Sequence, residues 1–251
     1  MIVRLILFDI DGTLVHGGPA KEAFHAAMVA TFGMAGDFEV HSFAGKTDPQ
    51  IARELLEGAG LDERAVNRGF PALWERYLEE LETRLSGSPM SVLHGVTEVM
   101  EALEGSGGAA LGLVTGNIAG GARLKLGSVG LVERFRVGSY GSDDEIRNHL
   151  PGIAIRRARE HFRRSFQPDD VVVVGDTPRD VACGRHEGTR TLGVATGRYD
   201  ALSLREAGAD HVFDDLSDTV AVLDALLDRG PSLRRSREWT GSRVRPGGAG
   251  P

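Results

Sequence analysis

Residues 2–14 read IVRLILFDIDGTL, a mostly apolar run that leads directly into two aspartates, a glycine and a threonine. The run is far shorter than the roughly 20 apolar residues of a membrane span and has no small-residue cleavage site, so it predicts a buried β-strand and no signal peptide. Asp9 and Asp11 follow this strand, and Gly12 permits a tight turn there. Ligands of open parallel sheets bind beyond the carboxyl ends of the strands, so this pair of carboxylates predicts a functional site.

Similar apolar runs recur along the chain, and a segment of helical period follows each of them. Residues 171–174 are four consecutive valines, which indicate a central parallel strand covered on both faces. The alternation predicts an α/β fold with a doubly wound, Rossmann-like parallel sheet. The expected strands are 2–8, 109–114, 135–137, 171–174, 190–194 and 211–213, and the expected helices are 96–103, 119–129, 153–162, 180–186, 201–207 and 219–227.

The stretch from residue 16 to residue 88, called the helical insertion below, breaks this alternation because it shows helical patterns and no convincing strand. Its expected helices are 20–32, 49–59 and 65–85, and Asp48 is the expected N-cap of the second. We predict a helical domain at 16–88, inserted into an α/β core formed by residues 1–15 and 89–229. The last residues, 230–251, are rich in Gly, Arg, Ser and Pro, which predicts a disordered basic tail.

The composition excludes several classes of protein. The 251 residues are 41% hydrophobic and 26% charged, which is typical of a soluble globular chain and not of a fibre or a disordered regulator. The formal net charge of -7 argues against a nucleic-acid binder, whose affinity rests on basic side chains. The single cysteine, Cys183, cannot form an intrachain disulfide, and no stretch is long and apolar enough to cross a membrane. We therefore expect a cytoplasmic protein, as a monomer or homodimer.

Two further strand ends carry polar groups. Residues 115–117 read Thr-Gly-Asn, which places a hydroxyl, a backbone N–H and a side-chain amide ahead of a helix, where phosphate oxygens are well held. After the four valines, residues 175–180 read Gly-Asp-Thr-Pro-Arg-Asp, so Asp176 and Asp180 supply a second pair of carboxylates. Acid pairs from two strands predict a hard-cation site with oxygen ligands, which suits Mg²⁺ better than Zn²⁺.

The succession of these motifs resembles a known family. DxDGT at the first strand, a Thr ahead of a helix at the second and GDxxxD after the valines are similar to the motifs of the haloacid dehalogenase superfamily. The chain resembles the phosphatases of that superfamily over about residues 2–228. The helical insertion matches in position the helical cap of the phosphoglycolate phosphatase-like and phosphoglucomutase-like branch. The resemblance implies hydrolysis of a small phosphorylated metabolite, phosphoglycolate-like in the first instance, through an aspartyl-phosphate.

The resemblance also implies a role for each matching residue. Asp9 is the expected nucleophile. Asp11 is the expected acid that protonates the leaving alcohol and then the base that activates water, which is reasonable because a leaving alkoxide needs a proton. The residues expected to hold the substrate and its phosphoryl oxygens are Thr13, Thr115, Gly116 and Asn117.

The expected metal ligands follow from the same comparison. Asp9, the backbone carbonyl of Asp11 and Asp176 would bind Mg²⁺, while Asp180 either ligates the ion or orients the other ligands. A carboxylate that attacks a phosphate dianion meets Coulomb repulsion of about 1 kcal/mol per charge pair at 4 Å in water, and several-fold more in a closed site. Mg²⁺ and one fixed cation remove that obstacle.

The fixed cation is where the chain departs from the family pattern, which has a lysine near the start of the helix after the third strand. The chain has only three lysines among its 29 basic residues, and none stands at that place; Lys125 falls only ten residues after Thr115. Arg147 is the only basic side chain just ahead of the helix expected to open at Pro151. We therefore expect Arg147 to be the catalytic cation. The alternative is a surface arginine paired with Asp143, Asp144 or Glu145.

The helical insertion is expected to supply substrate specificity. Lys46 and Thr47 precede a helix start, and Gly45 before them permits a close approach of the backbone. Lys46 is expected to neutralise a carboxylate or a second phosphate of the substrate. The alternative is a solvated lysine in a turn.

Three other functions remain open at this point. A phosphomutase of the same family keeps both aspartates of the first motif, so that motif does not exclude it. The family's dehalogenases lack the second aspartate, so Asp11 favours phosphoryl transfer. A non-catalytic phosphate-binding module such as a receiver domain places its phosphorylated aspartate on a later strand and has no large insertion after the first, so the motif order disfavours it.

Overall fold

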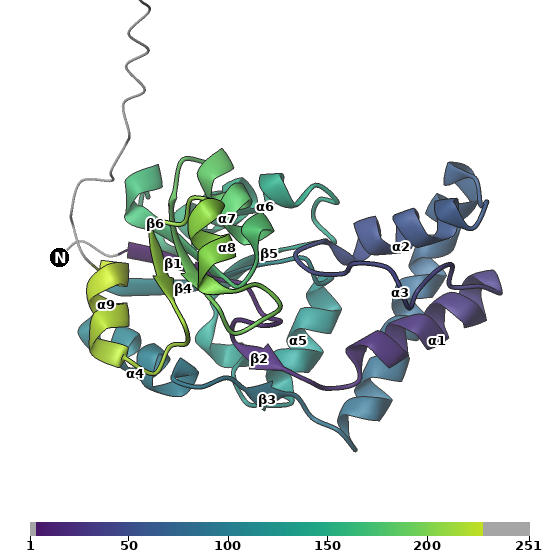
Figure 1. The fold of residues 1–251 in the computed structure, drawn as a ribbon, viewed down its shortest axis with the longest axis horizontal. Coiled ribbons are helices and arrows are strands. Elements are labelled where there is room, and N and C mark those ends of the chain that lie inside the picture. Colours follow the sequence, from purple (N-terminus) through teal and green to yellow (C-terminus); the bar gives the residue numbers. More distant parts are fainter. Residues whose placement is uncertain (1–3, 228–251) are drawn as a thin grey trace, which may run out of the picture.

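The computed structural model describes residues 4–227, which form a strand-and-helix core beside a separate group of helices (Figure 1). Six strands make one sheet in which every neighbouring pair is parallel. This confirms the predicted doubly wound α/β fold; the expected tail at 230–251 lies outside the described residues. In spatial order the strands are β5 (Val137–Tyr140), β4 (Ala109–Thr115), β1 (Arg4–Phe8), β6 (Val171–Gly175), β7 (Arg190–Val194) and β8 (His211–Phe213).

The helices that connect these strands begin and end within a few residues of the predicted limits. None of the helices in the described part of the chain is long and apolar enough to span a membrane. The core helices are α4 (Val96–Ser106), α5 (Ala119–Gly127), α6 (Leu150–Phe162), α7 (Pro178–His186), α8 (Ala201–Glu206) and α9 (Thr219–Leu227).

The central strand β1 is apolar throughout because both of its faces are covered. Leu5 and Leu7 pack into a core that contains residues of α6, whereas Ile6 and Phe8 pack into a second core that contains residues of α4. All four side chains are fully buried. Each contributes about 1.5–3 kcal/mol of hydrophobic stabilisation, so β1 is firmly held between the two helical layers and fixes the position of the residues that follow it.

The expected strand at 135–137 is wrong by two residues at its start. Residues Val132–Arg134 form a 3₁₀ turn, η1, and the backbone N–H of Phe135 closes it on the carbonyl of Val132. The Phe135 ring instead packs edge-on against the ring of Phe8, with centroids 6.2 Å apart. β5 therefore begins only at Val137, beside β4.

The helical insertion contains α1 (Ala20–Phe32), α2 (Asp48–Gly58) and α3 (Glu63–Leu85). Two short strands that the sequence did not predict, β2 (Val15–His16) and β3 (Ser91–Val92), pair antiparallel where the chain enters and leaves these helices. The expected N-cap is also off by one residue. The Thr47 hydroxyl, not the Asp48 carboxylate, accepts the N–H of Gln50, so Asp48 is the first residue of α2 and its side chain is free for another partner.

Candidate active site

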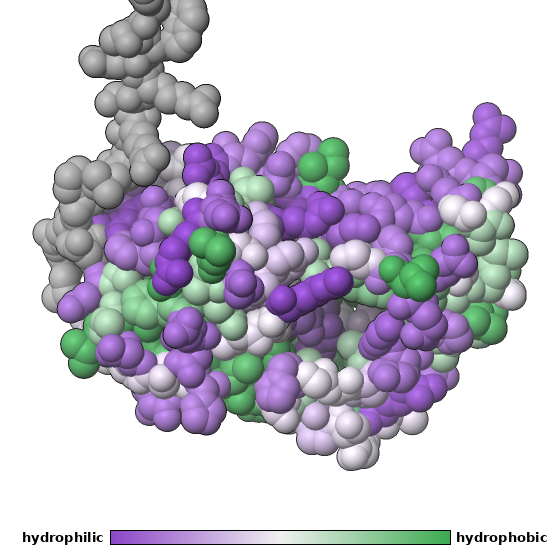
Figure 2. Space-filling view, in the orientation of Figure 1, coloured by the Kyte–Doolittle hydropathy of each residue, from purple (hydrophilic) through white to green (hydrophobic). Residues whose placement is uncertain are grey.

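A cavity of about 460 Å³ lies between the carboxyl ends of the strands and the helical insertion. Figure 2 shows the molecule hollowed between these two parts, with hydrophilic residues beside the hollow. The core contributes most of its polar wall, and the insertion contributes a mixed polar and aromatic wall. Lining residues from the core include Asp9, Asp11, Thr115, Gly116, Asn117, Lys125, Arg147 and Asp176, and those from the insertion include Phe24, Phe43, Lys46, Asp48 and Tyr77.

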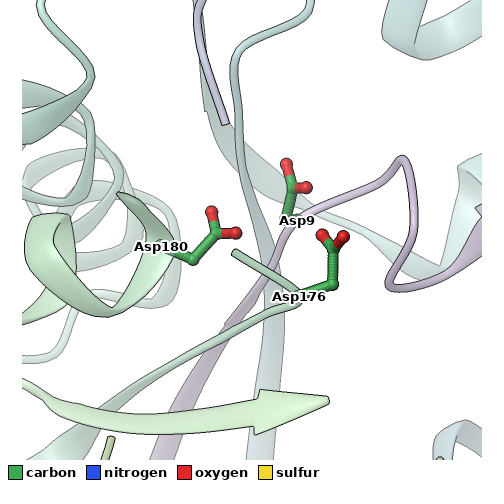
Figure 3. Close-up of side chains that lie close together, drawn as sticks. All are labelled: Asp9, Asp176 and Asp180. Carbon is green, nitrogen blue, oxygen red and sulfur yellow. The ribbon is translucent and has the colours of Figure 1, made fainter. Parts of the chain in front are cut away.

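Three of the predicted carboxylates meet beside this cavity. Asp9 follows β1, Asp176 follows β6 and Asp180 lies in the first turn of α7, and their carboxylates turn toward one another (Figure 3). One oxygen of each lies within 4.8 Å of the others, and all three residues are buried. Gly12 makes this convergence possible: its φ is +85°, and a Cβ at that position would lie 2.4 Å from a carboxylate oxygen of Asp176.

Burial and charge repulsion raise the pKa values of two of these carboxylates, Asp9 and Asp176. Burial raises the pKa of Asp9 to about 7, an effect that Asp180 and Asp11 increase and Arg147 opposes. Burial and the two neighbouring aspartates likewise raise the pKa of Asp176 to about 8. When all three are ionised, they face one buried guanidinium and leave two negative charges unbalanced. A divalent cation with a preference for oxygen ligands fits both the charge and the donor atoms, so the residues present suit Mg²⁺.

Asp180 differs from the other two because protein donors already occupy both of its oxygens. One oxygen of Asp180 accepts two hydrogen bonds from Thr177, from its backbone N–H at 2.9 Å and from its hydroxyl at 2.6 Å. The backbone bond is part of the capping box of α7. The other forms an ion pair with Arg147. Of the two roles left open by the sequence, this arrangement favours orientation of the neighbouring groups over direct ligation.

Arg147 reaches into the same cluster. It begins the 3₁₀ turn η2 (Arg147–His149) and is only 6% exposed. Its Nη2 donates to Oδ1 of Asp9 at 2.9 Å. The structure therefore excludes the alternative of a surface arginine: the three nearby acids have other partners, in the pairs Asp143 with Arg157, Asp144 with His149 and Glu145 with Arg53.

Thr115 ends β4 and Gly116 follows it, both at the edge of the cavity. The Thr115 hydroxyl oxygen accepts the backbone N–H and the side-chain Nδ2 of Asn117, at 3.3 and 2.8 Å. Its own proton therefore remains available for a phosphoryl oxygen. Gly116 permits the insertion to approach, because a Cβ there would lie 2.1 Å from the backbone carbonyl oxygen of Lys46.

Asn117 and Lys125 form a network that the sequence did not predict. The Asn117 amide donates to a carboxylate oxygen of Asp11 at 2.7 Å and accepts from the Lys125 ammonium at 2.6 Å. Lys125 also donates to both oxygens of Asp11, at 2.8 and 2.9 Å. No lysine stands at the family's usual position, and Lys125 reaches the site from a different helix, α5. The sequence does contain one indication of this role: Lys125 lies on the buried face of α5, and a buried lysine needs a charged partner.

Asp48 is the second residue that sequence reasoning missed, because its helix-start position already provided a sufficient local explanation. Asp48 is half-buried: its carboxylate accepts the backbone N–H of Ile118 at 2.8 Å, and its backbone N–H donates to the carbonyl of Gly116 at 2.8 Å. Burial raises the pKa of Asp48 to about 6, although the charge of Lys125 and the bond from Ile118 oppose the rise. Asp48 thus connects the helical insertion to the end of β4.

The side-chain amide of Asn117, a predicted substrate contact, is already bound to Thr115, Asp11 and Lys125. Three other predicted substrate contacts also have protein partners. The Lys46 backbone lines the cavity, but its ammonium is paired with Glu54 and lies 3.3 Å from the His41 ring. The hydroxyl of Thr47 donates to the backbone carbonyl of Glu145 at 2.8 Å. Thr13 is fully buried, and its hydroxyl lies 3.4 Å from a carboxylate oxygen of Asp176.

Comparison with known proteins agrees with this geometry. The sequence matches the haloacid dehalogenase-like hydrolase family over residues 6–194. It is 27% identical to the N-acetylmuramic acid 6-phosphate phosphatase of Pseudomonas putida, over 90% of this chain and 99% of that protein. It is 30% identical to a phosphoglycolate phosphatase of Xylella fastidiosa, over 75% of this chain and 79% of that protein. A solved hydrolase structure from Pseudomonas syringae superimposes with a TM-score of 0.68 at 21% identity, over 89% of this chain and 99% of that one.

The family match spans well over half of the chain, so the protein belongs to the haloacid dehalogenase-like hydrolase family. It is an enzyme of the hydrolase class, and the relatives that it matches over most of their length are phosphatases. The resemblance indicated by the three motifs is thereby confirmed.

Proposed function

We propose that the protein is a Mg²⁺-dependent phosphatase that hydrolyses a small phosphorylated metabolite through an aspartyl-phosphate on Asp9. The observation that carries the proposal is the buried cluster in which Arg147 binds one oxygen of Asp9 while Asp176 and Asp180 lie within 4.8 Å. Such a cluster concentrates positive charge, from the guanidinium and a bound cation, around one nucleophilic carboxylate. That arrangement suits attack on a dianionic phosphate.

Asp9 attacks phosphorus with its carboxylate, and the bond between phosphorus and the leaving oxygen breaks. Arg147 orients Asp9 and reduces its repulsion toward the phosphoryl oxygens, while the free proton of the Thr115 hydroxyl and the Gly116 N–H bind those oxygens. Bound by Asp9, Asp176 and the carbonyl of Asp11, Mg²⁺ would supply further positive charge on the phosphoryl group.

Asp11 serves the two proton transfers. Its carboxylate is bound by Lys125 and Asn117 at the wall of the cavity. In the first step its proton passes to the leaving oxygen and releases the alcohol. In the second step it accepts a proton from the water that attacks phosphorus, which frees Asp9 and inorganic phosphate.

The substrate proposed first is a phosphoglycolate-like phosphomonoester, in keeping with relatives named for phosphoglycolate and for N-acetylmuramic acid 6-phosphate. The backbone at Lys46 would form part of the substrate site, with Thr47 holding this segment against the core. We place the enzyme in the cytoplasm, as a monomer or homodimer that needs no macromolecular partner for the reaction.

The proposal is tested by phosphate release from a panel of phosphomonoesters with Mg²⁺, for the wild type, Asp9→Asn and the exposed control Asp37→Asn. We expect the wild type and the control to release phosphate and Asp9→Asn to be inactive. Wild-type activity in Asp9→Asn, or no turnover of any substrate including an aryl phosphate, would contradict it. Conversion of a sugar phosphate into its isomer without phosphate release would indicate a phosphomutase instead.

A further inference from the structure

The ammonium of Lys125 is committed entirely to protein groups. Lys125 is 5% exposed and lies on the buried face of α5 with Gly121, Ala122 and Leu126. Its three contacts are the two carboxylate oxygens of Asp11 and the amide oxygen of Asn117. A lysine ammonium has three protons, so these contacts leave none for a phosphoryl oxygen of the substrate. Lys125 is therefore unlike Arg147 and does not serve as a second phosphate-binding cation.

Burying an ammonium costs free energy of desolvation, so the presence of Lys125 on the buried face of α5 calls for a compensating interaction. An apolar side chain of similar length would fill the same space without the desolvation penalty of a charge. The carboxylate that Lys125 contacts is 45% exposed and belongs to the turn after β1. A half-exposed aspartate without partners samples several rotamers. Two hydrogen bonds from Lys125 and one from Asn117 hold it in a single orientation.

The charge of Lys125 also acts on the helical insertion. It lowers the pKa of the half-buried Asp48, whose carboxylate accepts the backbone N–H of Ile118 just before α5. The core contributes Asp11 and Asn117 to the surroundings of the ammonium, and the insertion contributes Asp48. The hydrogen bonds that orient Asp11 thus come from the core residues Lys125 and Asn117, and the insertion adds a nearby carboxylate.

We propose that Lys125 is a positioning residue for Asp11: it holds the carboxyl of the acid and base at the cavity wall, where the leaving oxygen of the substrate will lie. The inference rests on the proposed function, because it assigns Asp11 the proton transfers of that reaction. Lys125 forms no hydrogen bond with any of the three clustered aspartates, so it acts on proton transfer and leaves the attack by Asp9 unchanged.

The test compares two phosphomonoesters that differ in their need for a proton. An alkyl phosphate releases a basic alkoxide, whereas 4-nitrophenyl phosphate releases a stable phenolate. For Lys125→Met we expect kcat/KM for the alkyl substrate to fall by about tenfold or more, within the range of general acid catalysis, and for the aryl substrate by less than about threefold. Lys125→Arg, which keeps the charge, should restore most of the alkyl activity.

The matched control is Arg123→Met, which removes an exposed cation from the same helix and should leave both substrates unaffected. An equal fall for both substrates in Lys125→Met would overturn the inference, because a merely structural role reduces both alike. A fall no larger than that of Arg123→Met would overturn it as well. If Lys125→Met does not fold, as judged by circular dichroism, Lys125→Gln provides the same comparison. A wild type that hydrolyses neither substrate would instead refute the proposed function, and this inference with it.

Discussion

Arg147 and Asp9 lie 138 positions apart in the sequence, yet Nη2 of the arginine is 2.9 Å from Oδ1 of the aspartate in the buried centre of the site. The contact exists because β1 and the turn before α6 end at the same edge of the sheet. A cation at the start of a helix is opposed by the helix dipole. Its position there is explained by the carboxylates of Asp9 and Asp180, which stabilise the guanidinium and keep it protonated.

We expect Arg147→Ala to lower kcat by about 100-fold or more, comparable to the loss of one oxyanion-stabilising donor, or about 3 kcal/mol of barrier. Arg147→Lys should retain part of the activity, since it keeps the charge but loses the planar geometry. The control is Arg157→Ala, which breaks a more exposed arginine–aspartate pair with Asp143. Steady-state kinetics of the purified variants provide the measurement. Activity of Arg147→Ala within about threefold of wild type would show that the pair has no catalytic role.

Mg²⁺ binding should release protons near neutral pH. Burial raises the pKa of Asp9 to about 7 and that of Asp176 to about 8 without metal, so both retain protons at pH 6, and a metal ion must displace them. The affinity for Mg²⁺ is therefore expected to rise from pH 6 to pH 8 and to level off above that. Calorimetric titration of chelator-treated protein with Mg²⁺ in two buffers of different ionisation enthalpy measures the number of released protons. Asp176→Asn should abolish the heat of Mg²⁺ binding and the proton release. Binding that is independent of pH and releases no protons would contradict this expectation.

We expect the raised pKa of Asp48 to make the free energy of unfolding depend on pH. One substitution, Asp48→Asn, separates this contribution from that of other groups. The pKa of Asp48 rises from 3.8 to about 6 on folding, so the folded state holds the proton more tightly than the unfolded state. The protonated carboxyl therefore stabilises the folded state below pH 4, and this stabilisation of about 3 kcal/mol is lost as the pH rises through 6. Asp48→Asn keeps an acceptor for the Ile118 N–H and has no charge to bury. In urea unfolding with chelator, its free energy of unfolding relative to wild type should increase from pH 4 to pH 7. A constant difference would show that the Asp48 charge is not buried.

The sequence was sufficient to predict the sheet, the helices of the insertion and the carboxylates that cluster after β1 and β6, because these depend on short-range periodicity and on residues at strand ends. Arg147 was predictable by elimination, since no lysine stands at the expected place. The direction of long side chains was not predictable. Lys125 turns into the site and Lys46 turns away from it toward Glu54, and only the packing of α5 and α2 decides this. The contact of Asp48 with Ile118 was not predictable either. A helix-start pattern explains an aspartate at this position locally, and the distant partner of its carboxylate leaves no mark in the local sequence.

The close approach of the insertion to β4 gives a final prediction. A Cβ on Gly116 would lie 2.1 Å from the backbone carbonyl oxygen of Lys46, and backbone atoms cannot move aside as a flexible side chain can. Gly116→Ala keeps the N–H proposed to bind phosphate but prevents the contacts that Thr47 and Asp48 make with the core. We expect kcat/KM to fall by about tenfold or more, and protease cleavage within the insertion to become faster because opening costs less.

The control for this variant is Gly127→Ala at the end of α5, where nothing lies within 4 Å of the added methyl group. It should leave activity unchanged and alter stability by no more than about 1 kcal/mol. If Gly116→Ala matches this control in both kcat/KM and protease resistance, the insertion does not need to contact β4 for catalysis. That result would mean that the reaction does not require the hydrogen bonds of Asp48 to Gly116 and Ile118.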